Sequence, residues 1–280
     1  MASDQQTERP TRAFLAHEGP LSFAHRGGSA LAPENTLVAF EKGFSYGADA
    51  LELDVHPTRD GEMVVIHDDT LDRTTDGSGR VNGFTLDDLR QFDAGYRFTA
   101  DAGATYPYRG QGITVPTLDE VYARLPATRM NIEIKEDVPG TEERLWRVIQ
   151  THQAEDRTLV ASFLAAPLRR FRTISEGRVA TSGSKPEIRA FVLAAYAGVT
   201  QLLRPAYDAL QVSETYRGIP VVTPTTVRAA HRLGLAVVVW TVDDRPAMER
   251  LLGYGVDGLT SDRPDILAQT LAAWRVAHEA

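Results

Sequence analysis

The sequence predicts one α/β domain, a (β/α)8 or TIM barrel with an insertion between its second and third barrel strands. Three observations predict this fold class. Short apolar runs alternate with amphipathic stretches from Leu21 onward, eight of these runs have the length of strands, and 280 residues are a suitable size for one barrel. Residues 1–20 are then a loose N-terminal extension, and residues 21–280 form a single barrel domain.

The predicted barrel strands are short and apolar, and helical patterns separate most of them. The strands are expected at Leu21–His25, Ala50–Val55, Met130–Lys135, Thr158–Phe163, Arg178–Ser182, Ala209–Ser213, Ala236–Thr241 and Gly258–Ser261. Helices are expected between them, among others at Thr36–Tyr46, Thr141–Gln153 and Thr226–Leu233. Eight strands are the number that a closed barrel of this type requires.

Two stretches interrupt the alternation. Gly61–His67 begins with a favoured turn residue between apolar runs, which predicts a hairpin partner for the second strand. The insertion runs from Asp68 to about Gly112 (residues 68–112), is rich in Asp, Gly, Thr and Arg, and carries a short helix at Leu86–Phe92. Its place near the predicted active face makes it a candidate lid or specificity element, or else inert decoration.

Composition disfavours several classes of function and narrows the choice of metal. The formal net charge of -8 argues against non-specific binding to nucleic acid or anionic lipid. Because cysteine is absent, a metal would need oxygen or imidazole ligands, which favours hard cations. Residues 1–20 contain no continuous apolar stretch typical of a secretory signal or membrane span, so we expect a cytoplasmic protein without stable membrane insertion.

Two carboxylates are expected on the inner face of the second strand. Side chains alternate between the faces of a strand, so Glu52 and Asp54 point one way and the apolar residues of Ala50–Val55 next to them point the other way. The outer face of a barrel strand packs on helices and is apolar. The carboxylates should therefore face the interior, near the C-terminal end of the strand, where barrel enzymes carry their active sites.

Other strands bring further polar groups to the same end. Glu133 and Lys135 alternate with isoleucines, so they also face inward and add a third carboxylate and a cation. The first strand ends in His25 and Arg26, before two glycines that permit close approach of the backbone to a ligand. His67 follows the predicted hairpin and can fold back over the same mouth.

This combination of residue types suits phosphoryl chemistry. Carboxylate oxygens bind Mg²⁺ or Ca²⁺, cations offset the charge of a phosphate, and a histidine pair exchanges protons near neutral pH. Taken singly, each residue also has a structural interpretation, as half of an ion pair or as a polar residue at the end of a strand. The shared inward face of the three carboxylates favours the functional interpretation.

Several strings of the sequence resemble those of the glycerophosphodiester phosphodiesterase family. They are His25-Arg26-Gly27 with Pro33-Glu34-Asn35-Thr36; Glu52-x-Asp54-Val55 with Thr58-x-Asp60-Gly61, Val64 and His67-Asp68; Glu133-x-Lys135; Trp240-Thr241-Val242; and Thr260-Ser261-Asp262-Arg263-Pro264. The resemblance extends from about Phe23 to Ile266. It implies a barrel that hydrolyses glycerophosphodiesters to sn-glycerol 3-phosphate and an alcohol.

The resemblance also implies roles for seven residues, as three metal ligands, two proton-transfer groups and two phosphate contacts. In that order they are Glu52, Asp54 and Glu133; His25 and His67; and Arg26 and Lys135. The cofactor would be one divalent cation, for which Mg²⁺, Ca²⁺ and Mn²⁺ are all suitable. The division of labour between the histidines stays open, and so does the choice between attack by the substrate's own hydroxyl and by water.

Some residues near the predicted site have two interpretations. Phe163 and Trp240 lie at the ends of their strands, where they either form a wall of the substrate pocket or pack in the barrel core. Asn35 or Thr36 can cap the following helix, which is favoured over substrate contact by Glu34 or Asn35. His56 shares the inward face with the carboxylates but precedes a proline, which suggests a supporting or incidental place.

Two alternative functions remain. One is a lysophospholipase D-like activity on lysophospholipids, for which the insertion and the apolar run Ile113–Val115 could accommodate an acyl chain. The other is a non-catalytic barrel that binds phosphorylated ligands, since a fold alone does not guarantee activity. Such a protein would be expected to lack a carboxylate or a histidine of the set, and this chain keeps all of them. The sequence does not indicate an oligomeric state.

Overall fold

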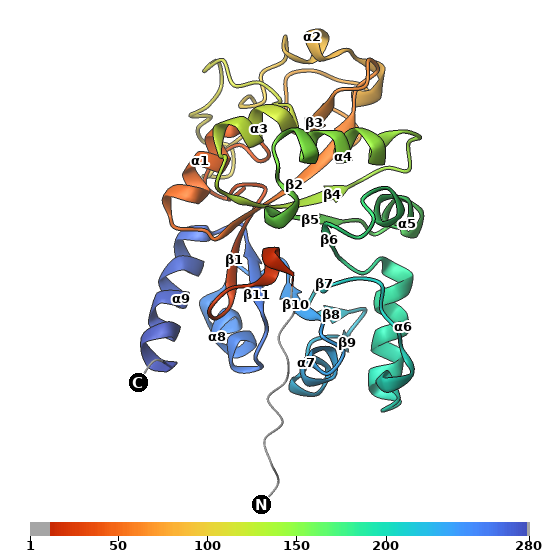
Figure 1. The fold of residues 1–280 in the computed structure, drawn as a ribbon. Helices are drawn as coiled ribbons and strands as arrows, with labels where there is room; N and C mark the ends of the chain where they lie inside the picture. The colour runs from red at the N-terminus through yellow and green to blue at the C-terminus, as the bar shows by residue number, and fades with distance from the viewer. Residues whose placement is uncertain (1–11, 279–280) are drawn as a thin grey trace, which may run out of the picture.

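A computed structural model describes residues 12–278 and confirms the predicted barrel (Figure 1). The eight barrel strands are β1 (Leu21–His25), β2 (Ala50–Pro57), β4 (Arg129–Ile134), β5 (Thr158–Ala161), β6 (Ala180–Thr181), β7 (Ala209–Val212), β10 (Ala236–Val239) and β11 (Gly258–Ser261). They pair in the order β6-β5-β4-β2-β1-β11-β10-β7, and every pair is parallel. A single parallel bridge between Ser182 and Ala209 connects the two ends of this order and nearly closes the ring.

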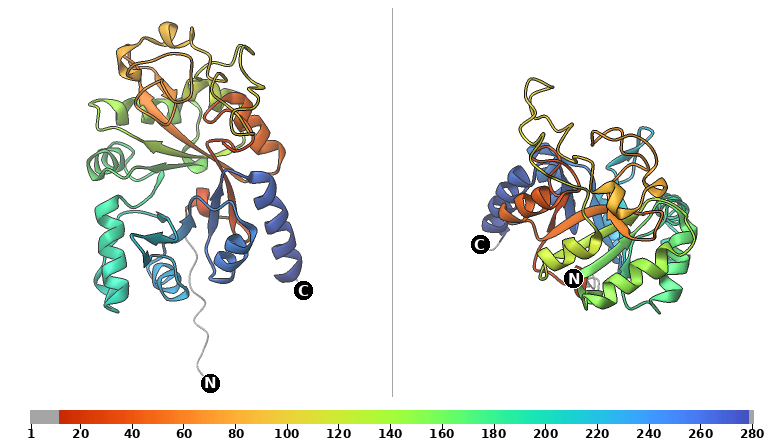
Figure 2. Two further views of the ribbon diagram at one scale, coloured as in Figure 1. Left: turned by 180° about the vertical axis from the view of Figure 1, so that it is seen from behind. Right: turned by 90° about the horizontal axis from the view of Figure 1, so that it is seen from above.

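Helices surround the strands, as Figure 2 shows from two further directions. They are α1 (Leu37–Ser45), α3 (Leu118–Arg124), α4 (Thr141–Thr151), α5 (Ala165–Ile174), α6 (Lys185–Tyr196), α7 (Pro224–His231), α8 (Arg245–Gly253) and α9 (Pro264–His278). Thr36 caps α1, because its side chain accepts a hydrogen bond from the backbone N–H of Ala39 at 3.2 Å. The capping prediction for the Pro33–Thr36 segment is therefore confirmed.

The outward faces of the strands are apolar and pack on the helices. Leu51 and Leu53 of β2, with Ile132 of β4, are fully buried in one cluster with residues of α1, α3, α4 and α5. A second cluster joins β7, β10 and β11 to α6, α7, α8 and α9. One apolar side of each strand therefore packs on the helices, and the opposite side faces the barrel interior.

The barrel interior is apolar at the N-terminal ends of the strands. Small alanines from several strands pack there around Phe23, whose ring leaves no room for a side chain at Gly258, where a Cβ would lie 2.8 Å from it. Phe14, in a 3-10 helix at Ala13–Leu15, is buried in the same cluster with its ring centre 6.2 Å from that of Phe23. Residues 12–20 of the expected loose extension are therefore packed on the barrel, and residues 1–11 lie outside the described part.

Five predicted strands end earlier than expected, three of them by one residue and two of them by two residues. The strand expected at Thr158–Phe163 ends at Ala161, and the one expected at Ala236–Thr241 ends at Val239. The following residues leave the strand pairing, and the chain turns toward the next helix. Phe163 and Trp240 consequently lie just beyond the strand ends, at the mouth of the barrel, instead of inside its core.

The segment between β2 and β4 departs from the βα alternation. As predicted, β3 (Met63–Val65) pairs antiparallel with β2 as a hairpin. Between β3 and α3 the chain forms only a 3-10 helix at Val81–Gly83 and the short α2 (Leu86–Leu89), over a small apolar cluster of its own. Figure 1 shows this segment, coloured orange to yellow, projecting beyond β3.

A minor hairpin, β8 (Thr215–Tyr216) with β9 (Ile219–Pro220), follows β7.

Among residues 12–278, no helix combines the length and the apolar character that crossing a bilayer requires.

Candidate active site

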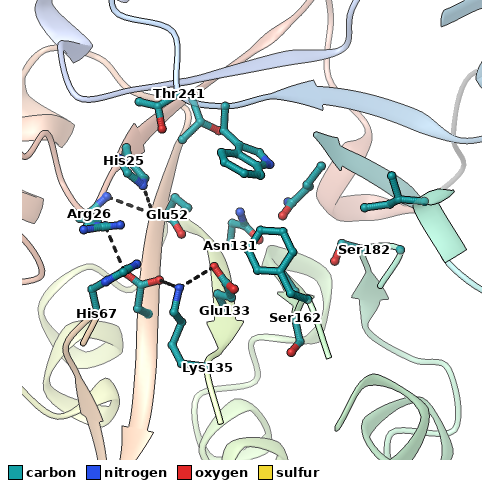
Figure 3. A pocket seen from close by; sticks show the side chains of 18 residues that line it. His25, Arg26, Glu52, His67, Asn131, Glu133, Lys135, Ser162, Ser182 and Thr241 are labelled. Carbon is teal, nitrogen blue, oxygen red and sulfur yellow. Dashed lines mark hydrogen bonds and ion pairs between the residues drawn. The ribbon is translucent and has the colours of Figure 1, made fainter. Parts of the chain in front are cut away.

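A pocket of about 160 Å³ opens at the C-terminal ends of the barrel strands. Its charged lining comes from β1, β2, β4 and the segments that follow β1, β3 and β4, whereas the strands from β5 to β11 contribute uncharged side chains. Figure 3 shows this division, with Arg26, His67 and Lys135 on one side and Ser162 and Ser182 on the other. The pocket can therefore hold a charged group and an uncharged group next to each other.

Three carboxylates form a compact cluster in the charged half. One oxygen from each of Glu52, Asp54 and Glu133 lies within 4.8 Å of the others. The strand register explains this, because Asp54 of β2 is the direct partner of Glu133 of β4. Burial and the neighbouring Asp54 raise the pKa of Glu52 to about 8. Burial also raises the pKa of Glu133, despite the nearby Lys135. Ionisation of all three carboxylates is thus unfavourable unless positive charge lies nearby.

The donor set fits a divalent cation. Carboxylate oxygens are the ligands that hard cations such as Mg²⁺, Ca²⁺ and Mn²⁺ prefer, and a cation among them would relieve the repulsion that raises the pKa of Glu52. Two side chains supply part of this positive charge. Nζ of Lys135 lies 3.3 Å from Asp54 and 3.2 Å from Glu133. Burial alone would raise the pKa of Asp54, but Lys135 and Arg26 outweigh it and lower that pKa.

Arg26 reaches over the cluster from the turn after β1. Its backbone is left-handed, with φ of 50°, and its N–H donates to Oε2 of Glu52 at 3.1 Å. Nε of its side chain lies 3.4 Å from Asp54, and Nη1 donates to Glu34 at 2.9 Å. The next residue is Gly27, where a Cβ would lie 2.6 Å from the backbone of α1. The glycine therefore lets this turn pack tightly against the helix.

His25 ends β1 beside the acidic cluster. Its Nδ1 lies 2.5 Å from Oδ1 of Asp262, and its Nε2 lies 3.7 Å from Oε2 of Glu52. Burial would lower the pKa of His25, but Glu52 and Asp262 outweigh burial and raise it. The hydrogen bond to Asp262 places a proton on Nδ1 and leaves Nε2 as the ring nitrogen that is available for exchange.

His67 has the same kind of support on the other side of Arg26. Its Nδ1 lies 2.6 Å from Oδ1 of Asp68, which Arg73 also holds. The backbone carbonyl of His67 accepts a hydrogen bond from Nε2 of His56 at 3.1 Å, so His56 supports the site without lining the pocket. Burial lowers the pKa of His67, although Asp54 and Asp68 act against it.

Phe163 and Trp240 meet edge to face in the uncharged half, with ring centres 5.7 Å apart. Phe163 is 44% exposed and lines the pocket, so it does not pack in the barrel core. Ile113 and Val115 do not line the pocket. They pack instead in the apolar cluster of the segment after β3.

All nine residues that the sequence singled out line this one pocket. They are His25, Arg26, Glu52, Asp54, His67, Glu133, Lys135, Phe163 and Trp240. The sequence did not single out Asp262, Asp68, Arg73 or Glu34 as partners of the histidines and of Arg26. Three of these four, Glu34, Asp68 and Asp262, stand in the strings that resemble the family, and that was the available signal. Arg73 stands in none of them.

A barrel with such a pocket at its strand ends defines a class of protein, the TIM-barrel enzymes that carry acidic, cationic and imidazole groups at the C-terminal face. Within this class, the chain belongs to the family described as "Glycerophosphoryl diester phosphodiesterase family", which residues 25–266 match. The match runs from His25, the last residue of β1, to the start of α9, and so includes the other seven strands of the barrel.

Curated relatives agree over nearly the whole length. A glycerophosphodiester phosphodiesterase of Caldanaerobacter subterraneus subsp. tengcongensis is 36% identical over 255 residues, which are 88% of this chain and 96% of that protein. A probable glycerophosphodiester phosphodiesterase 2 of Mycobacterium tuberculosis is 34% identical over 269 residues, 94% of this chain and 95% of that protein.

A solved structure shares the fold. The phosphodiesterase of Oleispira antarctica, in complex with the product sn-glycerol-3-phosphate, has a TM-score of 0.71 and 26% identity, and the match covers 90% of this chain and 97% of that one. The two sequence relatives thus carry the name of a glycerophosphodiester phosphodiesterase, in one case as a probable one, and the structural relative carries the name of a phosphodiesterase.

Proposed function

We propose that this protein hydrolyses glycerophosphodiesters to sn-glycerol 3-phosphate and an alcohol, and that it depends on a divalent cation. The observation that carries the proposal is the cluster of Glu52, Asp54 and Glu133, whose oxygens lie within 4.8 Å of one another beside two cations and two histidines. Membership of the phosphodiesterase family and the product complex of the Oleispira antarctica relative support the same reaction.

In this proposal Glu52, Asp54 and Glu133 hold the cation. When bound, the cation supplies positive charge that polarises the phosphate and stabilises the charge that develops on its oxygens. Mg²⁺, Ca²⁺ and Mn²⁺ all suit three carboxylates. Arg26 and Lys135 bind the phosphate oxygens that face them, since both side chains line the pocket beside the cluster. The phosphate charge is thereby offset from two sides.

His25 and His67 carry the proton transfers. One accepts the proton of the attacking nucleophile, which is either water or the substrate's own hydroxyl followed by water, and the other donates a proton to the departing alkoxide as the P–O bond breaks. Support comes from their surroundings, because each Nδ1 contacts an aspartate, Asp262 or Asp68, which keeps the imidazole in one orientation with Nε2 available. Their two pKa values are shifted in opposite directions, which suits one acid and one base.

The uncharged half of the pocket receives an organic group of the diester. Phe163 and Trp240 offer aromatic faces, and no charged side chain among residues 12–278 lines this half. For a lysophospholipid substrate we find no supporting contact, because Ile113 and Val115, the expected acyl-chain contacts, pack away from the pocket. Glycerophosphodiesters without an acyl chain are therefore the proposed substrates.

A substrate panel tests the proposal. Glycerophosphocholine, glycerophosphoethanolamine and lysophosphatidylcholine are assayed with chelator-treated protein, to which Mg²⁺, Ca²⁺ or Mn²⁺ is then added singly. We expect release of sn-glycerol 3-phosphate from the first two substrates, only after metal is restored. Full activity in the presence of chelator would contradict the role of the cluster, and preference for the lysophospholipid would contradict the substrate class.

A further inference from the structure

Arg73, in the segment between β3 and α3, joins two carboxylates with one guanidinium. Nη1 and Nη2 each donate to Glu34 at 2.7 Å. Nε and Nη2 donate to Asp68 at 2.7 Å and 3.1 Å. Each carboxylate thus receives two parallel hydrogen bonds, a planar arrangement that an ammonium group does not reproduce.

Each of these carboxylates in turn contacts a side chain that lines the pocket. Oε1 of Glu34 accepts a hydrogen bond from Nη1 of Arg26 at 2.9 Å, and Oδ1 of Asp68 contacts Nδ1 of His67 at 2.6 Å. Arg73 itself does not line the pocket, and its side chain is 47% exposed. Arg73 therefore contacts the site only through these two carboxylates. It reaches Arg26 through Glu34 and His67 through Asp68. Figure 3 shows Arg26 and His67 on the same side of the pocket.

The position of Arg26 depends on a balance between two carboxylates. Its Nη1 is bound to Glu34, while its Nε lies 3.4 Å from Asp54 of the acidic cluster. Arg73 takes both oxygens of Glu34, which fixes the plane of that carboxylate and limits how far it can draw Arg26 away from Asp54. Without Arg73, Glu34 is free to pair with Arg26 through both oxygens.

The orientation of His67 depends on Asp68 in a similar way. Asp68 follows His67 directly in the chain, and without a second partner its side chain can rotate toward solvent. The bonds from Nε and Nη2 of Arg73 hold both oxygens of Asp68, so Oδ1 stays at Nδ1 of the imidazole. Arg73 therefore restrains both the guanidinium of Arg26 and the imidazole of His67.

We propose that Arg73 is a positioning residue, which by holding Glu34 and Asp68 together fixes the guanidinium of Arg26 and the imidazole of His67 beside the acidic cluster. This inference rests on the proposed function, because it takes Arg26 as a phosphate contact and His67 as a proton-transfer group. The proposal also assigns a role to the segment between β3 and α3, because Arg73 connects that segment to the turn after β1 through Glu34.

The first test compares Arg73→Gln and Arg73→Lys with the wild type, using glycerophosphocholine and saturating divalent cation. We expect Arg73→Gln to lower kcat about 10- to 100-fold, the usual effect of removing a residue that orients a site. We also expect KM to rise, because Arg26 loses its fixed place. Arg73→Lys keeps the charge but not the paired bonds, so it should resemble Arg73→Gln. Near-native kinetics of Arg73→Lys would show that charge alone suffices, and would overturn the proposal.

A second set of variants separates the effect of Arg73 through Asp68 from its effect through Glu34. Asp68→Asn should mainly lower kcat, through His67, and Glu34→Gln should mainly raise KM, through Arg26. If Arg73 acts through Asp68, the double variant Arg73→Gln/Asp68→Asn should lose little more in kcat than the more severe single variant. Fully additive losses in kcat would contradict action through Asp68.

Controls distinguish positioning from general destabilisation. Arg90 lies in the same segment, is 46% exposed and pairs with Glu120 at 2.8 Å, so Arg90→Gln should keep wild-type kinetics. Thermal unfolding of every variant reports loss of fold. If Arg73→Gln unfolds, Arg73→Gly assayed with added guanidinium chloride takes its place, and recovery of kcat at constant unfolding temperature supports the proposal.

Different results would overturn the positioning role of Arg73 and the proposed function. Wild-type kcat and KM for a folded Arg73→Gln would overturn the positioning role and leave the proposed function intact. Absence of glycerophosphodiester hydrolysis by the wild-type protein would overturn the proposed function itself.

Discussion

Asp262 follows the last barrel strand and contacts His25, which ends the first, with 2.5 Å between Oδ1 and Nδ1. The two residues are 237 positions apart. They become neighbours because β1 and β11 are parallel partners, with Ala24 opposite Ser261. Burial would raise the pKa of Asp262, but the bond to His25 outweighs it and lowers that pKa, so the residue is a carboxylate at neutral pH. Its charge holds one proton of His25 on Nδ1.

Replacing this carboxylate should impair turnover more than stability. In Asp262→Asn the amide can donate to Nδ1, which favours the tautomer with the proton on Nε2. We expect kcat on glycerophosphocholine to fall about 10- to 100-fold, with little change in the thermal unfolding temperature. Asp265→Asn is a matched control, because Asp265 pairs with Arg263 and does not line the pocket. Equal kcat values for the two variants would contradict the role of Asp262.

Turnover of substrates with leaving groups of different acidity should distinguish the roles of His25 and His67. His25→Ala and His67→Ala should each lower turnover of glycerophosphocholine about 10²–10⁴-fold, the usual contribution of a general acid or base. A p-nitrophenyl ester of glycerol phosphate releases a stable anion that needs no proton. The variant that lacks the general acid should therefore regain activity on this substrate, and the variant that lacks the base should not. Near-native turnover of glycerophosphocholine by either variant would contradict the assignment.

The raised pKa of Glu52 predicts an unusual pH dependence of stability for the metal-free protein. Its folded pKa is about 8, against an ordinary value of 4.5, so between these values the folded protein binds more protons at this site than the unfolded chain. The contribution of Glu52 to stability is therefore lost as the pH rises through this interval. Thermal unfolding of chelator-treated protein should show a smaller fall from about pH 5.5 to about pH 8.5 in Glu52→Gln than in the wild type.

Divalent cations should reverse this loss. Because a bound cation replaces the proton on Glu52, addition of Mg²⁺ or Ca²⁺ should raise the unfolding temperature of the wild type most at the alkaline end of the interval. Identical pH profiles for the wild type and Glu52→Gln, with and without metal, would contradict the participation of Glu52.

The aromatic pair of the uncharged half should affect binding more than catalysis. Phe163→Ala removes an exposed ring that meets Trp240 at 5.7 Å, so we expect KM for glycerophosphocholine to rise about 2- to 10-fold, with a smaller change in kcat. Phe44 of α1 is comparably exposed, at 49% against 44%, but lies outside the pocket. Phe44→Ala should leave KM unchanged, and an unchanged KM for Phe163→Ala would argue against a substrate wall.

Much of the fold and of the candidate site was predictable because it follows from local patterns. Alternation along β2 and β4 was enough to place Glu52, Asp54 and Glu133 on the inner face, and the limits of β1 and β11 agree with prediction. The ends of β5 and β10 were harder, since Phe163 and Trp240 continue an apolar run but no longer have a strand partner. Strand pairing depends on neighbours that a local pattern does not contain.

By itself, therefore, the sequence determined the fold class and the inward-facing carboxylates of β2 and β4, because both follow from the periodicity of strands and the apolar requirement of helix packing. Only the tertiary structure decided the partners of those side chains. The contact of Asp262 with His25, the bridge of Arg73 between Glu34 and Asp68, and the packing of Phe14 on Phe23 all join distant segments. Such contacts exist only after the ring of strands closes and brings its connecting segments together.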